Sequence, residues 1–299
     1  FRRVLFRSRK SCILCGRSSG RYLEIYLIEE RQTSGCRRKD KNMEKKYLFF
    51  DIDGTLTDRS TGEIVPSARE ALTRLEENGH FVAIATGRAH YKARKFTDAN
   101  GFKNMVCCGG NGCVIDNELV ENIPLDKDGC IKIIHQAEEL GYGWCVALDD
   151  TKDVYMTDDK FLRQVGKRKE PTRYIIDDML EVEKADAIYK VYVAIPKEDE
   201  EKLTTKELVG HLRFEPEYLM FQPDNKRGGI IKMMEHLNAD IKDVVVFGDD
   251  YNDMDMFCPE WFSIAMGNAC QDLKDIANYV TDSNVDDGIK NACEHFGWI

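Results

Sequence analysis

The sequence predicts an α/β protein: a Rossmann-like core with a parallel sheet and helices on both faces, plus an inserted α+β cap domain. Short, densely apolar runs at 47–50, 81–85 and 244–247 alternate with stretches of helical spacing. Such alternation is typical of strands joined by right-handed helical crossovers. The pattern changes between about 115 and 221 and then returns. This order indicates one parallel-sheet domain that a second domain interrupts.

The alternation of predicted strands and helices is clearest in the first part of the core. The run at 47–50 is apolar without helical spacing, as expected of a strand buried on both faces. Apolar residues then recur at helical spacing and stop before Gly79. A strand at 81–85, a helix at about 89–99 that ends before Gly101, and a strand at 104–108 follow.

The middle of the chain has a different pattern. Its strands are expected to be longer and more alternating, as at 188–195, with helices at 131–140 and 199–208 between them. Alternation predicts a sheet with one solvated face, so we expect an α+β domain here. Because it interrupts the core, this domain would cover the strand ends as a lid.

The last part repeats the alternation of the first part. We expect a helix at 229–237, a strand at 244–247, a helix near Met254, a strand at 262–266 and two closing helices. The predicted segments are a non-native or disordered extension (1–42), the first part of the core (43–115), the inserted cap (116–221) and the second part of the core (222–299).

The first 42 residues differ from the rest in charge. They hold twelve basic and four acidic residues and so have a net charge of +8. Because the net charge of the whole chain is −10, the other 257 residues have a net charge of −18. A targeting peptide, a nucleic-acid arm and upstream sequence outside the functional protein are the alternatives. We favour a non-native or disordered extension, because Glu24, Glu29 and Glu30 argue against a transit peptide.

The composition of the remaining chain indicates which partners and which cellular compartment to expect. Its acidic charge disfavours nucleic acid and anionic membranes as partners. Its cysteines lie scattered, mostly in apolar runs, and predict buried thiols in a reducing compartment, so we expect a cytoplasmic protein. The oligomeric state stays open.

Two aspartates follow the first strand of the core. Asp51 and Asp53 would lie at the carboxyl edge of the sheet, where open α/β sheets hold ligands. Two neighbouring carboxylates stay charged together only if a cation or hydrogen-bond donors offset them. A solvated turn is the alternative. A calcium loop does not fit, because Gly54 is fourth from Asp51 and the twelfth residue is Gly62 rather than Glu.

Three further signals fall at the same predicted edge. Thr86-Gly87-Arg88 ends the second strand, Lys226 begins a helix, and residues 248–253 (GDDYND) follow the apolar run at 244–247. Thr-Gly usually only ends a strand, and a lysine is usually solvated. The order and spacing of all four signals make a chance arrangement improbable.

These residues resemble the haloacid dehalogenase-like hydrolases, specifically the Cof-type phosphatases with a large inserted cap. The resemblance covers Met43 to Ile299 and rests on DIDGTLTD (51–58) and GDDYND (248–253). Asn111-Gly112 before the cap and the AMGNA stretch (265–269) are also similar. The extension at 1–42 lies outside it. A Mg²⁺-dependent phosphatase acting on a small phosphorylated metabolite is the function that the resemblance implies.

The resemblance also implies catalytic roles. Asp51 would attack phosphorus and form an aspartyl-phosphate, which divides hydrolysis into two displacements. Asp53 would protonate the leaving alcohol and then accept a proton from water. Thr86, Gly87 and Lys226 would hold the phosphate oxygens, and Asn252 would complete the phosphate or metal contacts.

A magnesium site is implied by the same resemblance. Asp51, Asp249 and the main-chain carbonyl of Asp53 offer the hard oxygens that suit octahedral Mg²⁺. Asp253 would support these ligands directly or by orienting its neighbours.

Two other functions remain open at this level. A phosphomutase or phosphotransferase would use the same aspartyl-phosphate, and a catalytically silent metabolite-binding regulator would have lost turnover. The Gly-rich stretch 109–112 lacks the spacing of a dinucleotide site and predicts a hinge or tight turn into the cap. The sequence does not identify the substrate.

Overall fold

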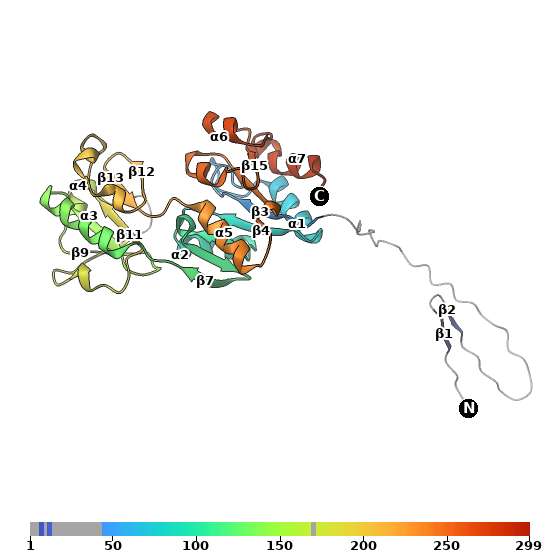
Figure 1. Ribbon diagram of the computed structural model, residues 1–299, viewed down its shortest axis with the longest axis horizontal. Coiled ribbons are helices and arrows are strands. Elements are labelled where there is room, and N and C mark those ends of the chain that lie inside the picture. The colour runs from blue at the N-terminus through green and yellow to red at the C-terminus, as the bar shows by residue number, and fades with distance from the viewer. Residues whose placement is uncertain (1–5, 9–10, 14–43, 169–171) are drawn as a thin grey trace, which may run out of the picture. The chain divides into compact units, whose positions relative to one another are not determined.

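The computed structural model describes residues 6–8, 11–13, 44–168 and 172–299 (Figure 1). Contacts divide the chain into two compact units, Phe1–Lys41 and Asn42–Ile299. The described part of the first unit is an antiparallel pair, β1 (Phe6–Ser8) and β2 (Ser11–Ile13). The prediction made for 1–42 falls almost wholly outside the described residues. All that follows concerns the second unit.

An eight-stranded sheet has the strand order β16-β15-β14-β3-β4-β5-β6-β7. Neighbours from β16 to β5 run parallel, whereas β6 and β7 pair antiparallel. The strands are β3 (Tyr47–Phe50), β4 (Phe81–Ala85), β5 (Met105–Cys107), β6 (Gly112–Ile115), β7 (Glu118–Asn122), β14 (Val244–Gly248), β15 (Phe262–Ala265) and β16 (Tyr279–Val280). The predicted α/β class and parallel core are confirmed, with an antiparallel edge added.

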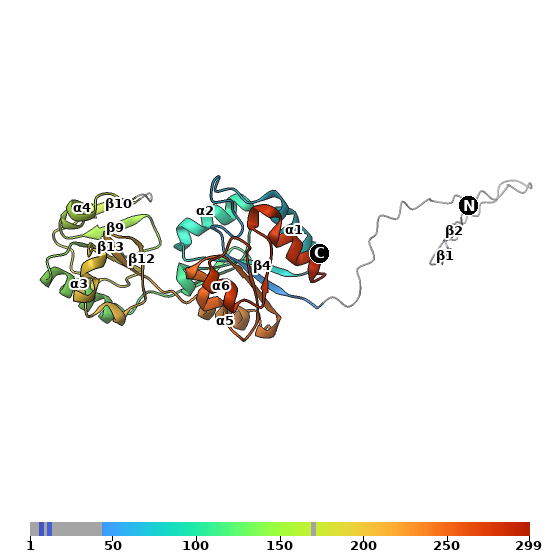
Figure 2. The same ribbon diagram turned by 90° about the horizontal axis from the view of Figure 1, so that it is seen from above.

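Helices cover both faces of this sheet. Successive residues of β14 alternate between the two cores: Val245 and Phe247 pack with α1, α2 and α7, and Val244 and Val246 with α5 and α6. Figure 2 shows α1 and α2 on one side of β4 and α5 and α6 on the other. The helices are α1 (Pro66–Glu77), α2 (His90–Asn100), α5 (Lys226–His236), α6 (Gln271–Ile276) and α7 (Gly288–His295), with 3₁₀ turns η1 (Cys108–Gly110), η5 (Ile241–Asp243), η6 (Tyr251–Met256) and η7 (Asn284–Asp286).

A second, six-stranded sheet has the order β10-β9-β8-β11-β13-β12. Only β9 and β10 pair in parallel among these strands. Its elements are α3 (Lys127–Glu139), β8 (Trp144–Ala147), β9 (Asp153–Met156), α4 (Lys160–Val165), β10 (Arg173–Ile176), η2 (Val182–Lys184), β11 (Lys190–Val193), η3 (Lys197–Lys202), η4 (Lys206–Leu208), β12 (His211–Glu215) and β13 (Tyr218–Phe221).

Several expectations for this part were wrong. Its strands are four or five residues long, no longer than most strands of the core. The central strand β11 is covered on both faces, because Val191 and Val193 pack with α3 while Tyr192 packs with Phe161 of α4. The expected solvated face is therefore partly a second small core.

The helix expected at 199–208 is two 3₁₀ turns, η3 and η4. The Gln136 side chain accepts hydrogen bonds from the backbone N–H (2.9 Å) and hydroxyl (2.7 Å) of Thr205, which removes a donor from any continuous helix. The helix expected near Met254 is also a 3₁₀ turn, η6. Helical spacing alone did not separate α from 3₁₀ structure in these short segments.

The two sheets are joined at a close backbone crossing. Gly109 and Gly110 have positive φ values of 63° and 104°, and a Cβ there would lie 1.8 Å from the Pro223 carbonyl oxygen or 1.9 Å from that of Asn225. Only glycine fits such an approach. The stretch 109–112 thus lies where the outgoing chain passes the returning one.

The domain boundaries remain a prediction. β7 lies within the range expected for the cap, yet it pairs in the eight-stranded sheet. Leu125, just after β7, packs instead in the core of the six-stranded sheet. We therefore propose that the first junction lies after Asn122 rather than after residue 115.

No helix within the described ranges combines the length and the apolar character that a membrane-spanning helix needs.

Candidate active site

The register of the sheet brings two aspartates to one edge. β3 and β14 pair in parallel from Tyr47 with Val244 to Phe50 with Phe247, so both strands end at the same level. Asp51 follows β3 directly, and its backbone N–H donates to the Phe247 carbonyl at 3.1 Å. Asp249 follows β14 directly. Both carboxylates are buried.

Lys226 joins this edge from the first turn of α5. The side chain of the N-cap residue Asn225 accepts from the Gly228 N–H at 2.9 Å, which fixes the start of the helix. The Lys226 side chain is 1% exposed, and its ammonium donates to Asp51 Oδ1 at 2.8 Å and to Asp253 Oδ1 at 2.5 Å. The cation thus bridges two carboxylates from separate elements.

Asp253 also organises the loop after β14. Its second oxygen, Oδ2, accepts from the backbone N–H of Asp249 at 2.9 Å and of Asp250 at 3.2 Å. Gly248 leaves room for this, because a Cβ there would lie 2.7 Å from Asp253 Oδ2. Both Asp253 oxygens therefore hold neighbours of the site in place.

The cluster shifts the pKa values of its members. Burial, reinforced by the Asp253 charge and opposed by Lys226, raises the pKa of Asp51 to about 7. Burial and the Asp253 charge likewise raise the pKa of Asp249 to about 6. For Lys226, burial lowers the pKa, but Asp253 and Asp51 raise it more, so the lysine stays charged. An additional cation would stabilise both carboxylates as anions.

Asp249 is held from the other side by the first motif. The Thr55 hydroxyl donates to its Oδ1 at 2.9 Å, and Nη2 of Arg59 donates to its Oδ2 at 2.7 Å. Gly54 has a φ of 96°, and a Cβ there would lie 2.3 Å from Asp249 Oδ2. In the Asp-Gly-Thr sequence, Gly54 therefore leaves space for the Asp249 carboxylate and Thr55 donates a hydrogen bond to it.

Three of the four residues predicted as metal ligands form one cluster. Carboxylate oxygens of Asp51, Asp249 and Asp253 lie within 4.8 Å of one another, and all three residues are buried. Buried carboxylate oxygens are the donors that hard divalent cations prefer. The residues present therefore fit a divalent metal ion.

The Asp53 side chain lies outside this cluster. It is 64% exposed and accepts from Arg88, with Nη2 at 2.6 Å from Oδ1 and Nε at 3.2 Å from Oδ2. The ligand predicted from this residue was its main-chain carbonyl, which stays a prediction. Arg88 contributes a positive charge that the sequence motif had not assigned to any partner.

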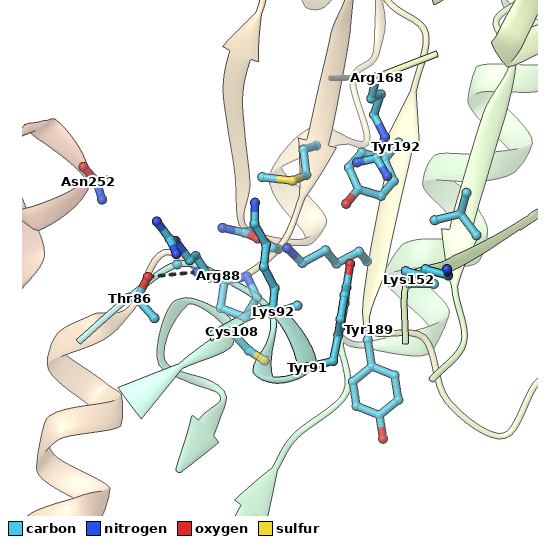
Figure 3. A pocket seen from close by; sticks show the side chains of 18 of the residues that line it. Thr86, Arg88, Tyr91, Lys92, Cys108, Lys152, Arg168, Tyr189, Tyr192 and Asn252 are labelled. Carbon is cyan, nitrogen blue, oxygen red and sulfur yellow. Dashed lines mark hydrogen bonds between the residues drawn. The ribbon is translucent and has the colours of Figure 1, made fainter. Parts of the chain in front are cut away.

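Three of the four predicted phosphate contacts lie on the wall of one cavity of about 890 Å³. Thr86, Gly87 and Asn252 line it together with Asp51 and Asp53. Figure 3 shows Thr86 at the end of its strand and Asn252 on a separate element of the core. Lys226 does not line the cavity but contacts Asp51, which does; its predicted role as a phosphate contact stays a prediction.

The same cavity extends to residues of the six-stranded sheet and its loops. Asp150 from this side accepts the backbone N–H of Tyr91 at 2.9 Å and contacts Nδ1 of His90 at 2.5 Å, at the N-terminus of α2. A carboxylate is favourable there because the first N–H groups of a helix lack partners within the helix. The cavity wall from this side includes Lys152, Arg168, Tyr189, Lys190, Tyr192 and Tyr218.

Sequence reasoning missed three contributors to the site: Arg59, Arg88 as a partner of Asp53, and Asn268. The Asn268 side chain donates to the Gly54 carbonyl at 2.8 Å. Its signal was the AMGNA stretch, which had been noted without a role. Arg59 carries no such signal, because a lysine or arginine after a turn is usually solvated.

Comparisons with known proteins agree with this geometry. The family model of the haloacid dehalogenase-like hydrolases matches residues 48–292. YkrA of Bacillus subtilis (strain 168) is 30% identical over 260 residues, which cover 86% of this chain and 100% of that protein. The pyridoxal phosphate phosphatase YbhA of Escherichia coli (strain K12) is 28% identical over 269 residues, covering 83% and 97%.

Solved structures show the same fold. A hypothetical protein from Geobacillus kaustophilus HTA426 has a TM-score of 0.72 and 26% identity, covering 86% of this chain and 100% of that one. The sugar phosphatase BT4131, of haloacid dehalogenase subclass IIB, has a TM-score of 0.68 and 25% identity, covering 85% and 100%. The matched family, the relatives and the acidic site together establish that this chain belongs to the haloacid dehalogenase-like hydrolases, as a phosphoric monoester hydrolase of the Cof type.

Proposed function

We propose that this chain is a Mg²⁺-dependent phosphatase that hydrolyses a small phosphorylated metabolite through an aspartyl-phosphate on Asp51. The observation that carries the proposal is the buried cluster of Asp51, Asp249 and Asp253 with Lys226. Three carboxylates and one ammonium give this cluster a net negative charge, and Asp51 connects it to the cavity. Such a site favours a divalent cation, and with that cation it favours a phosphate ester.

Asp51 is the proposed nucleophile because it combines burial with access to the cavity. Lys226 donates to Asp51 Oδ1, which leaves Oδ2 as the oxygen that attacks phosphorus. The attack forms an O–P bond and breaks the bond to the leaving alcohol oxygen. Water then attacks the same phosphorus and releases inorganic phosphate with free Asp51.

A divalent ion held by Asp51, Asp249 and the Asp53 carbonyl would neutralise charge on the transferred phosphoryl group. Asp253 supports this set in the proposal, directly as a ligand or by holding Lys226 through Oδ1 and the Asp249 backbone N–H through Oδ2. Its contacts keep Asp249 and Lys226 at fixed places. Positioning of this kind is the main demand of phosphoryl transfer.

Asp53 is the proposed acid and base. Nη2 and Nε of Arg88 both donate to its carboxylate, so Arg88 competes with a substrate oxygen for Asp53. A phosphate ester offers Arg88 an alternative anion in the same cavity. We therefore propose that substrate binding draws Arg88 to the phosphate and frees Asp53 for proton transfer.

Thr86, Gly87 and Asn252 complete the proposal as phosphate contacts. Their position on the cavity wall supports this role. The relatives named as phosphatases of pyridoxal phosphate and of a phosphoribitylamino-uracil support a small phosphorylated metabolite as substrate. The cavity of about 890 Å³ has the size of a small-molecule site.

The test is hydrolysis of p-nitrophenyl phosphate with Mg²⁺ by wild type and Asp51→Asn. We expect turnover by the wild type, loss of turnover in EDTA, and a decrease of roughly 10⁴-fold or more in Asp51→Asn. Phosphate release without a sugar-bisphosphate activator would distinguish a phosphatase from a phosphomutase. Equal turnover by wild type and Asp51→Asn would overturn the nucleophile assignment.

A further inference from the structure

Arg168 occupies an unusual position on the cavity wall. Its guanidinium carbon lies 3.8 Å from the centroid of the Tyr192 ring, so the planar cation stacks on an aromatic face (Figure 3). Tyr192 in turn contacts Tyr218 edge to face, with ring centroids 6.1 Å apart. Arg168, Tyr192 and Tyr218 all line the cavity. The stack is part of the wall that a ligand would meet.

One hydrogen bond holds the Arg168 side chain, and a second holds its backbone. Its Nη2 donates to the Thr172 hydroxyl at 2.9 Å, and its backbone N–H donates to the Tyr174 hydroxyl at 3.0 Å. Its Nε is buried without a partner. Among the residues that the structure describes, no carboxylate forms an ion pair with Arg168, in contrast to the neighbouring Arg163 and Arg173.

An immobilised guanidinium without an anion is a poor way to stabilise a fold. A partly desolvated charge costs free energy unless an opposite charge or enough acceptors replace the lost water. Arginine presents five N–H donors in a rigid fork that matches an oxyanion, and stacking on an aromatic ring leaves the edge of the fork free. The arrangement is complete only when an anion meets that edge.

Two acidic residues on the same wall, Asp149 and Asp150, have other partners. Asp150 is bound to the N-terminus of α2, and Asp149 accepts from the Thr151 hydroxyl at 2.6 Å. Basic and acidic residues both line this side of the cavity, so no general positive field would attract an anion. Recognition would depend on direct contact with Arg168.

We propose that Arg168, stacked on Tyr192, binds a second anionic group of the substrate, a carboxylate or phosphate remote from the phosphate that Asp51 attacks. This inference rests on the proposed function, because it names the substrate class of the same cavity. The substrate is then a phosphate monoester with an oxyanion at its far end. Arg168 is a specificity residue and takes no part in the chemistry.

Competition against p-nitrophenyl phosphate hydrolysis tests this without requiring turnover of each compound. Two matched pairs of inhibitors differ only in the far-end anion: 6-phosphogluconate against glucitol 6-phosphate, both open chains, and fructose 1,6-bisphosphate against fructose 6-phosphate. We expect the member with the far-end anion in at least one pair to have an inhibition constant roughly 10- to 100-fold lower, as charge-assisted hydrogen bonds provide. The pair that shows the preference identifies carboxylate or phosphate.

Arg168→Gln should reduce that ratio of inhibition constants to near one, and Arg168→Lys should retain part of it. Arg163→Gln is the matched control, since it removes a guanidinium from α4 outside the cavity wall and should keep the wild-type ratio. The ratio is measured within each protein, so a variant with less folded enzyme still reports it. A variant without measurable hydrolysis is replaced by Arg168→Lys.

Two results would overturn the inference: ratios near one for both pairs in the wild type, or a wild-type ratio in Arg168→Gln. Either result leaves the proposed function intact if Asp51→Asn is still inactive on p-nitrophenyl phosphate. Failure of the wild type to hydrolyse that compound would instead refute the proposed function itself.

Discussion

The side chains of Lys226 and Arg168 are both positively charged and fixed by their neighbours, but they differ in how their charge is neutralised. Lys226 is fully buried between the carboxylates of Asp51 and Asp253. Arg168 is half-buried on the ring of Tyr192 and pairs with no carboxylate of the described chain. The first cation is balanced by two carboxylates, whereas the second has no carboxylate partner among the described residues, and we propose that a ligand supplies one.

In the proposals made above, Lys226 belongs to the catalytic site and Arg168 determines which substrates bind. The lysine and its carboxylates are positioned by strand register and by the start of α5, independently of any substrate. Preorganised charge is the main source of catalysis in phosphoryl transfer. Arg168, in contrast, is held on the ring of Tyr192, and no described carboxylate accepts a hydrogen bond from it. We propose that its free N–H donors select the substrate.

The largest expected effect comes from breaking the balanced cluster. Lys226→Met leaves Asp51 and Asp253 buried without their cation and should lower the free energy of unfolding by roughly 3–5 kcal/mol. Urea denaturation of the metal-free protein measures it. Lys232→Met, on the same helix with a partly exposed lysine 3.6 Å from Glu121, is the control and should cost about 1 kcal/mol or less. Equal losses in the two variants would contradict the comparison.

A smaller effect is expected at Arg59, which pairs with Asp249 and Asp250. Its side chain is 59% exposed and competes with a metal ion for the Asp249 carboxylate. Arg59→Gln should therefore lower the Mg²⁺ concentration for half-maximal activity by up to about fivefold. Titration of activity with Mg²⁺ measures this, with Arg69→Gln on α1 as the control. A higher Mg²⁺ requirement would show that Arg59 assists the site instead.

Replacing the unbalanced cation should cost little. Arg168→Met removes an unpaired charge and a cation–π contact, two changes of opposite sign. The free energy of unfolding without ligand should stay within about 1 kcal/mol of the wild type, in contrast to Lys226→Met. Denaturation of both variants side by side checks this. A loss as large as that of Lys226→Met would mean that Arg168 is structural.

The smallest effect concerns a buried group outside both sites. Burial lowers the pKa of His80 below its ordinary value of 6.5, and its Nδ1 accepts from the Lys46 N–H at 3.0 Å. The unfolded chain then binds more protons, so stability falls as pH decreases through 6.5. His80→Gln should flatten the dependence of stability on pH between 7 and 5. Denaturation of both proteins at several pH values in this range measures the slope, and an unchanged slope in His80→Gln would contradict the prediction.

Much of the core could be predicted from the sequence alone. Densely apolar strands at 47–50 and 81–85 and the helix before Gly79 are local patterns, and the structure has β3, β4 and α1 there. Strand ends in a parallel sheet meet at one edge, so Asp51 and Asp249 had to lie close. A local period and a topological rule were sufficient for the fold class and for the acidic cluster.

The six-stranded part was harder to predict. Alternation at 188–195 indicated one solvated face, but α4 covers the other face with Phe161. Whether the second face of a sheet is solvated or covered by a helix depends on where that helix packs. The local sequence of the strand does not predict this.

The sequence by itself determined the order of the core elements, the acids at the sheet edge and the lysine that begins α5, because each follows from the periodicity of its own segment. Only the tertiary structure decided that Arg88 holds Asp53, that Arg59 holds Asp249, and that Arg168 lies on Tyr192 with no carboxylate partner among the described residues. These pairings join side chains of flexible length across separate elements. Their geometry depends on packing in three dimensions, which spacing along the chain does not encode.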